Sequence, residues 1–75
     1  MTNNVKSERV RIGLTQEELA EALGIHVNTV RLWERSECKP GSNNLLAMRE
    51  IFGCTPDYLL GLTDERVGHD AATFA

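Results

Sequence analysis

The chain of 75 residues has few means of stabilising itself apart from a hydrophobic core. It contains only two cysteines, Cys38 and Cys54, so at most one disulfide is possible. Because no secretory signal is recognisable, two free thiols in a reducing cytoplasm are the better interpretation. No apolar run approaches the about 20 residues that span a membrane. We therefore expect a cytoplasmic protein with no membrane partner.

Residue sets that carry out catalysis are also missing. The sequence has no serine–histidine–acid set, no metal-ligand spacing and no phosphate-binding loop. His26 stands alone, and the second histidine, His69, lies far from it in the sequence. We therefore expect no enzyme, no metal, no cofactor and no small-molecule ligand.

Proline is scarce, with two residues, whereas 41% of the chain is hydrophobic. This balance is typical of a compact helical domain rather than of a disordered chain. A chain of this length forms one domain at most. Its core supplies only about 3–5 kcal/mol of net stability, so association with a partner is a reasonable expectation.

The most informative stretch begins at Thr15, a residue type that caps helix N-termini well. Glu18, three residues later, completes a capping box. Apolar residues then follow at helical spacing, and Gly24 stands where this helix must end, because glycine accepts a left-handed backbone without steric cost. The apolar positions are Leu19, Ala20 and Leu23.

A second helical pattern starts after Ile25 and His26 and runs to Arg35, with Val30 and Trp33 facing inward. Two short helices joined by so tight a turn cannot pack side by side, and they must cross at a large angle. Ala20 stands where they approach most closely, and a small side chain is needed there. The pattern predicts a helix-turn-helix whose second helix projects from the body of the domain.

This stretch resembles the Cro/lambda-repressor-type (XRE-like) family of DNA-binding helix-turn-helix domains. The resemblance runs from about residue 5 to residue 62. It implies an all-α fold, a compact set of five short helices around one core, and sequence-specific binding of double-stranded DNA. Its strongest residues are Leu14, Thr15, Gln16, Leu19, Ala20, Leu23, Gly24, Val30, Trp33, Glu34, Pro40, Gly53, Asp57, Tyr58, Leu59 and Leu60.

Apolar periodicity, caps and glycines place the helices along the chain. We assign residues 1–63 to the helix-turn-helix domain and residues 64–75 to a polar, flexible C-terminal tail. The expected helices are Val5–Ile12, Gln16–Leu23, Val27–Arg35, one that begins between Gly41 and Asn44 and ends before Gly53, and a short one that starts at Pro56 after the Thr55 cap.

Arg9 is anomalous because it shares the inward face of the first helix with Val5 and Ile12. Glu34, at the end of the third helix, is its natural partner, and members of the resembled family pair an arginine and a glutamate at these positions. The alternative is two solvated charges, as most helix charges are. We expect the ion pair.

The resemblance implies that the third helix meets the major groove through the positions of His26, Val27, Asn28 and Leu32. The Asn28 amide can donate to and accept from an adenine edge. Val27 and Leu32 could contact thymine methyl groups, but they could equally be core residues or part of a protein interface. Gln16 lies beside helix N–H groups that attract phosphate. The full expected DNA-binding set is Gln16, His26, Val27, Asn28, Thr29, Arg31, Leu32, Arg35 and Lys39.

The net charge of −3 opposes simple electrostatic binding to DNA. Its distribution is uneven, since residues 1–49 hold seven Lys/Arg and six Asp/Glu, whereas residues 50–75 hold one and five. The acidic excess is thus expected away from the DNA face. We expect weak non-specific binding and a dependence on base contacts or dimerisation.

The fifth helix carries more apolar surface than a short terminal helix needs, which suggests a partner. We expect a dimer interface formed by Tyr58, Leu59, Leu60 and Leu62. The resulting interpretation is a homodimeric repressor that occludes a promoter at a near-palindromic operator. The alternative is a protein-interaction module, such as the antitoxin half of a toxin–antitoxin pair.

Overall fold

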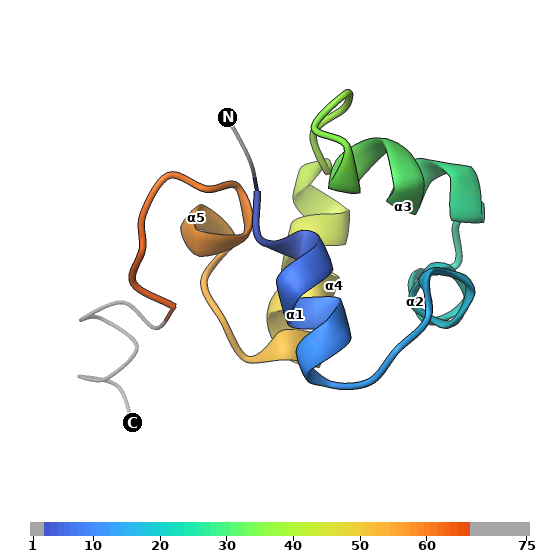
Figure 1. The fold of residues 1–75 in the computed structure, drawn as a ribbon, viewed down its shortest axis with the longest axis horizontal. Helices are drawn as coiled ribbons and strands as arrows, with labels where there is room; N and C mark the ends of the chain where they lie inside the picture. Colours follow the sequence, from blue (N-terminus) through green and yellow to red (C-terminus); the bar gives the residue numbers. More distant parts are fainter. Residues whose placement is uncertain (1–2, 67–75) are drawn as a thin grey trace.

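The computed structural model describes residues 3–66, which fold into helices with no strand among them (Figure 1). The all-α prediction is confirmed. The first three helices differ from the expected ranges by one residue at most, whereas the fifth helix ends at Leu59. The helices are α1 (Val5–Arg11), α2 (Gln16–Leu23), α3 (Val27–Glu34), α4 (Ser42–Phe52) and α5 (Pro56–Leu59).

The caps read from the sequence set the start and the end of α2. Thr15 Oγ1 accepts a hydrogen bond from the backbone N–H of Glu18 at 3.0 Å, and Glu18 Oε1 accepts from Thr15 N–H at 2.9 Å. At the other end, Gly24 has a φ of 68°. The left-handed residue reverses the chain within three residues, so that α3 starts almost at once and crosses α2.

The core lies between all five helices, with α2 and α5 at opposite ends of the long axis of the molecule (Figure 1). Trp33 on α3 and Leu19 on α2 are its largest enclosed side chains, and Ala20 is 3% exposed. Because only one side of α3 is buried, the other side runs along an edge of the molecule. The buried hydrophobic residues are Val5, Leu19, Ala20, Val30, Trp33, Met48, Phe52, Cys54 and Leu59.

Serine holds the position at which α3 ends. Ser36 has a φ of +61°, and its N–H donates to Trp33 O while Glu37 N–H donates to Leu32 O. This pair of bonds is the Schellman motif, which usually has glycine at the left-handed residue. Here serine takes the left-handed conformation instead.

Glu8 is a buried charge that the sequence did not reveal. It is 3% exposed, and its Oε1 accepts from Arg11 Nε at 3.2 Å and from Arg66 Nε at 2.9 Å. Arg66 also receives a backbone bond, from Thr55 N–H to Arg66 O at 3.0 Å. The expected boundary at residue 63 is therefore too early, because Arg66 packs on α1. The rest of the predicted tail, residues 67–75, lies outside the described residues.

Glu8 makes stability sensitive to acid. Burial raises the pKa of Glu8, but the hydrogen bonds and charges of Arg66 and Arg11 outweigh it and hold the pKa below the usual 4.5. A carboxylate with a lowered pKa stabilises the fold above its unfolded-state pKa, and this stability is lost as the pH falls through the folded-state pKa. We expect Glu8→Gln to cost about 1–3 kcal/mol at pH 7 and progressively less below about pH 4.5.

Denaturant melts between pH 7 and pH 3 measure this difference. Glu21→Gln is the matched control, because Glu21 is an exposed acid on α2. Its difference from the parent should stay near zero at every pH. A loss in Glu8→Gln that does not change with pH would contradict the assignment.

Candidate nucleic-acid interface

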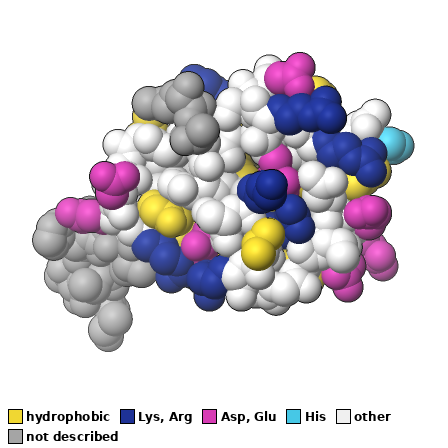
Figure 2. All heavy atoms as spheres, viewed as in Figure 1, with side chains coloured by type: hydrophobic (Ala, Val, Ile, Leu, Met, Phe, Trp, Pro, Cys, Tyr) yellow, Lys and Arg dark blue, Asp and Glu magenta, His cyan; other side chains and the backbone are white. Residues whose placement is uncertain are grey.

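The outer side of α3 carries a stripe of mostly polar side chains. Asn28, Arg31, Leu32 and Arg35 line a shallow hollow there. Their spacing of three, one and three residues places them on one side of a helix. Figure 2 shows Lys and Arg side chains gathered over α3, while acidic side chains gather over the neighbouring α2. The basic stripe is therefore local, although the whole chain is acidic.

The start of α3 is fixed by His26. Its Nδ1 accepts from the backbone N–H of Asn28 at 3.1 Å, so the imidazole is the N-cap of α3. This bond uses Nδ1 as an acceptor and leaves Nε2 as the other ring nitrogen of an exposed side chain. The sequence placed His26 at the groove, and the structure adds this capping role.

Two neighbours in the expected set are half-buried. Of the roles left open for Val27, the structure shows the side chain packed against the core. Thr29 is also half-buried, and its N–H donates to His26 O at 3.0 Å. Val27 therefore stands at the inner margin of the stripe, whereas Thr29 has the same intermediate exposure as Arg31 and Leu32.

Two basic residues frame the end of α3. Arg35 and Lys39 are exposed, as a phosphate contact requires. Arg35 Nη1 lies 3.7 Å from Glu37 Oε2, with both side chains more than half exposed. A surface pair of this kind contributes little and leaves the guanidinium available to an anion.

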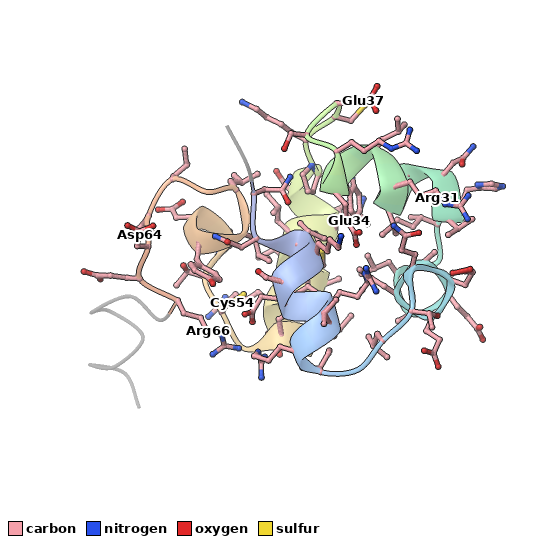
Figure 3. All side chains as sticks on the ribbon, viewed as in Figure 1. Arg31, Glu34, Glu37, Cys54, Asp64 and Arg66 are labelled. Carbon is pink, nitrogen blue, oxygen red and sulfur yellow. The ribbon has the colours of Figure 1, made fainter. Side chains whose placement is uncertain are left out.

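Arg9 and Glu34, which were expected to pair, are in direct contact. Arg9 Nε donates to Glu34 Oε2 at 2.6 Å and Arg9 Nη2 to Oε1 at 3.3 Å. The side chains are only 11% and 6% exposed. Arg9 Nη1 also donates to Leu14 O at 2.8 Å, which fixes the loop before α2. Glu34 lies beneath α3, on the side of α1, so the pair anchors the end of α3 to the domain (Figure 3).

Gln16 connects this buried pair to the exposed stripe. Its Nε2 donates to Glu34 Oε1 at 3.0 Å, and its Oε1 accepts from Arg31 Nε at 3.4 Å. Arg31 Nη1 in turn donates to Asn28 Oδ1 at 3.2 Å. Sequence reasoning identified these residues singly but not their connection, because Gln16 and Glu34 are 18 positions apart and no local pattern relates them.

The expected dimer surface needs a correction. Leu59 is 0% exposed and belongs to the core, so its side chain cannot reach a partner. Tyr58 is partly buried against the same core. Leu60 is partly exposed and lines a hollow with Pro40, whereas Leu62 is 63% exposed. Within residues 3–66, the apolar surface available near α5 is therefore Leu60 and Leu62, and the other large hydrophobic side chains exposed in that range are Val10 and Leu46.

Residues 3–66 lack the features of a metal site and of a membrane-spanning helix. In this range no group of three or more His, Cys, Asp or Glu side chains is placed to hold a metal ion. No helix in the same range has the length and apolar character needed to cross a membrane. Both cysteines are free thiols, Cys38 exposed and Cys54 buried.

Comparison with known proteins agrees with this geometry. A family model described as helix-turn-helix matches residues 5–59. Repressor protein C2 of Salmonella phage P22 is 35% identical over 60 residues, which cover 80% of this chain and 28% of that protein. The type II methyltransferase M.SsoII of Shigella sonnei is 42% identical over 65 residues, which cover 77% of this chain and 17% of that protein. This chain spans between 17% and 46% of the lengths of the curated relatives it matches.

A solved structure also matches this chain. The P22 c2 repressor protein, crystallised with a synthetic operator, superposes with a TM-score of 0.70 at 35% identity, over 76% of this chain and 86% of that one. The resemblance to Cro/lambda-repressor-type domains is thereby confirmed. The chain belongs to the helix-turn-helix family.

Proposed function

We propose that the chain binds double-stranded DNA in a sequence-specific manner and regulates transcription, with α3 as its recognition helix. The observation that carries the proposal is the mostly polar stripe Asn28, Arg31, Leu32 and Arg35, which lines a shallow hollow along α3, with Asn28 and Arg35 exposed. A helix exposed on one side fits the major groove, where donors, acceptors and methyl groups identify the base pairs. The structural relative that was crystallised with an operator supports this docking.

The proposed DNA contacts are of two kinds: contacts to phosphates, which position the domain, and contacts to base edges, which read the sequence. Arg35 and Lys39, at the exposed end of α3, bind phosphates, and His26 presents Nε2 to the backbone at the other end. Gln16 retains a second N–H, which adds a donor at the start of α2. Asn28, Arg31 and Leu32 face the base edges. Val27 contributes only from the inner margin, since its side chain packs against the core.

The active species is a homodimer that acts as a repressor by occluding a promoter in the cytoplasm. One recognition helix covers too few base pairs to select a site in a genome, and a symmetric pair on a near-palindromic operator solves this problem. Leu60 and Leu62 form the dimer surface. The alternative, a protein-interaction module, is less well supported, because Val27, a candidate for a protein interface, packs against the core.

Selection from a pool of random-sequence duplexes tests DNA recognition. The parent should enrich a defined sequence motif, and a pool that remains random would overturn the proposal. Lys39→Ala should then weaken binding to all duplexes about equally and lower the slope of log affinity against log salt by about 0.9, one phosphate contact. The matched control is Arg49→Ala, which removes one exposed positive charge from the far end of α4 and should leave the slope unchanged (Figure 1).

A further inference from the structure

We infer that Gln16 is a positioning residue that holds Arg31 in place, so that the Asn28 side chain bound to Arg31 presents its NH₂ group to DNA and selects guanine. The inference rests on the proposed function and specifies what the α3 stripe reads. It starts from the order of hydrogen bonds in the chain Glu34–Gln16–Arg31–Asn28. The Glu34 carboxylate can only accept and the Arg31 guanidinium can only donate, whereas the amides of the other two residues can do both.

Each contact in this chain has only one possible polarity. An ionised carboxylate can only accept, so the Gln16 amide must face Glu34 with its NH₂ group. The carbonyl oxygen of Gln16 is then left for Arg31. A guanidinium can only donate, so Asn28 must face Arg31 with Oδ1. The orientation of the Gln16 amide thus follows from the buried carboxylate, and that of the Asn28 amide follows from the guanidinium, which Gln16 helps to hold in place.

Burial fixes the contact between Glu34 and Gln16 more strongly than the other contacts of the chain. The Glu34 side chain is 6% exposed and is held by Arg9, so its carboxylate cannot turn away from α2. Gln16 is half-buried, whereas Asn28 is exposed. The chain of hydrogen bonds therefore runs from the buried Glu34 carboxylate to the exposed Asn28 side chain. Arg31, between them, is braced at both Nε and Nη1.

This order decides which base Asn28 reads. A two-bond contact with adenine needs an amide oxygen as well as an amide NH₂ at the base edge. Arg31 holds Oδ1, so the NH₂ group of Asn28 is what faces outward. Guanine offers two acceptors in the major groove, N7 and O6, whereas cytosine offers only an amino donor. The adenine contact expected from the sequence is replaced by a contact with guanine.

The inference is tested by the base preferences of the parent, Asn28→Ala, Asn28→Asp and Gln16→Met. For each protein, bound sequences are selected from random-sequence duplexes, and the protein is then titrated against duplexes that differ at one position. The position read by Asn28 is the one whose preference disappears in Asn28→Ala. There the parent should favour guanine over the other bases by about tenfold or more. Asn28→Asp keeps the contact to Arg31 but turns an acceptor outward, so the preference should change to cytosine. Gln16→Met removes the link to Glu34 and should reduce the guanine preference severalfold at this position alone.

The control is Glu17→Met, an exposed neighbour in the same turn, which should keep the guanine preference of the parent. A uniform loss of affinity in Gln16→Met, with every base preference intact, would assign Gln16 to a phosphate and overturn its positioning role. A parent that favours adenine at the Asn28 position would overturn the reading polarity. Both outcomes leave the proposed function standing, whereas a parent that enriches no motif would overturn the proposed function itself.

Discussion

Replacing Glu34 with alanine is expected to lower the free energy of unfolding by about 3–5 kcal/mol, most of the stability of a domain this small. The variant leaves the Arg9 guanidinium enclosed, with only 11% of its side chain exposed and its carboxylate partner gone. The cost arises from the uncompensated buried charge and from the lost acceptor for Gln16. Denaturant melts followed by circular dichroism measure it.

A double variant separates the buried charge from the pair itself. Arg9→Met combined with Glu34→Leu removes both charges and should recover much of the loss, since apolar residues of similar size replace a buried pair at little cost. The control is Glu37→Ala, because the Arg35–Glu37 pair is 3.7 Å long and exposed and should contribute a few tenths of a kcal/mol. A Glu34→Ala protein as stable as Glu37→Ala would show that the pair contributes nothing to the fold.

Leu62→Glu is expected to reduce affinity for a whole near-palindromic operator by about 100-fold, because the two recognition helices would no longer act as one binding unit. In the proposed two-fold pair these helices lie about 34–36 Å apart, one turn of DNA. Leu62 is 63% exposed, so the substitution should not disturb the monomer. Titrations against whole and half operators, together with sedimentation equilibrium, measure the loss.

Leu46→Glu is the matched control for the dimer surface. Leu46 is 54% exposed on α4, so the same charge is added at the same kind of site away from the chain that follows α5. It should leave binding to the whole operator unchanged. If the parent binds a half operator as tightly as the whole one, or if Leu62→Glu binds the whole one as tightly as the parent, the dimer proposal is wrong.

Local signals in the sequence predicted much of this fold. The Thr15–Glu18 capping box and Gly24 act within one turn of the chain, so a short window of sequence contains the whole cause. The Arg9–Glu34 contact joins distant residues. The charge on an inward face indicated that Arg9 needed a partner, and the resemblance to the family favoured Glu34 over two solvated charges.

Two features could not be predicted from the sequence, because they depend on how the chain folds after α5: the different exposure of Leu59 and Leu62, and the burial of Glu8. The run from Tyr58 to Leu62 is apolar almost throughout, so periodicity could not tell the enclosed Leu59 from the exposed Leu62. Gly61, with a φ of 79°, turns the chain after α5 and separates the two leucines. Likewise Glu8 and Arg66 are 58 positions apart, and Glu8 carried no local sign of burial.

Burial of Cys54 gives this domain an internal chemical reporter. Enclosure of the thiol, followed by the negative charge of Glu8, raises the pKa of Cys54 to about 11. At pH 8 only about 0.1% of such a thiol is ionised, and the thiolate is the form that alkylating reagents attack. Cys38 is exposed and serves as the reference in the same molecule. The ratio of the two alkylation rates therefore measures how often the junction between α4 and α5 opens, without any added label or substitution.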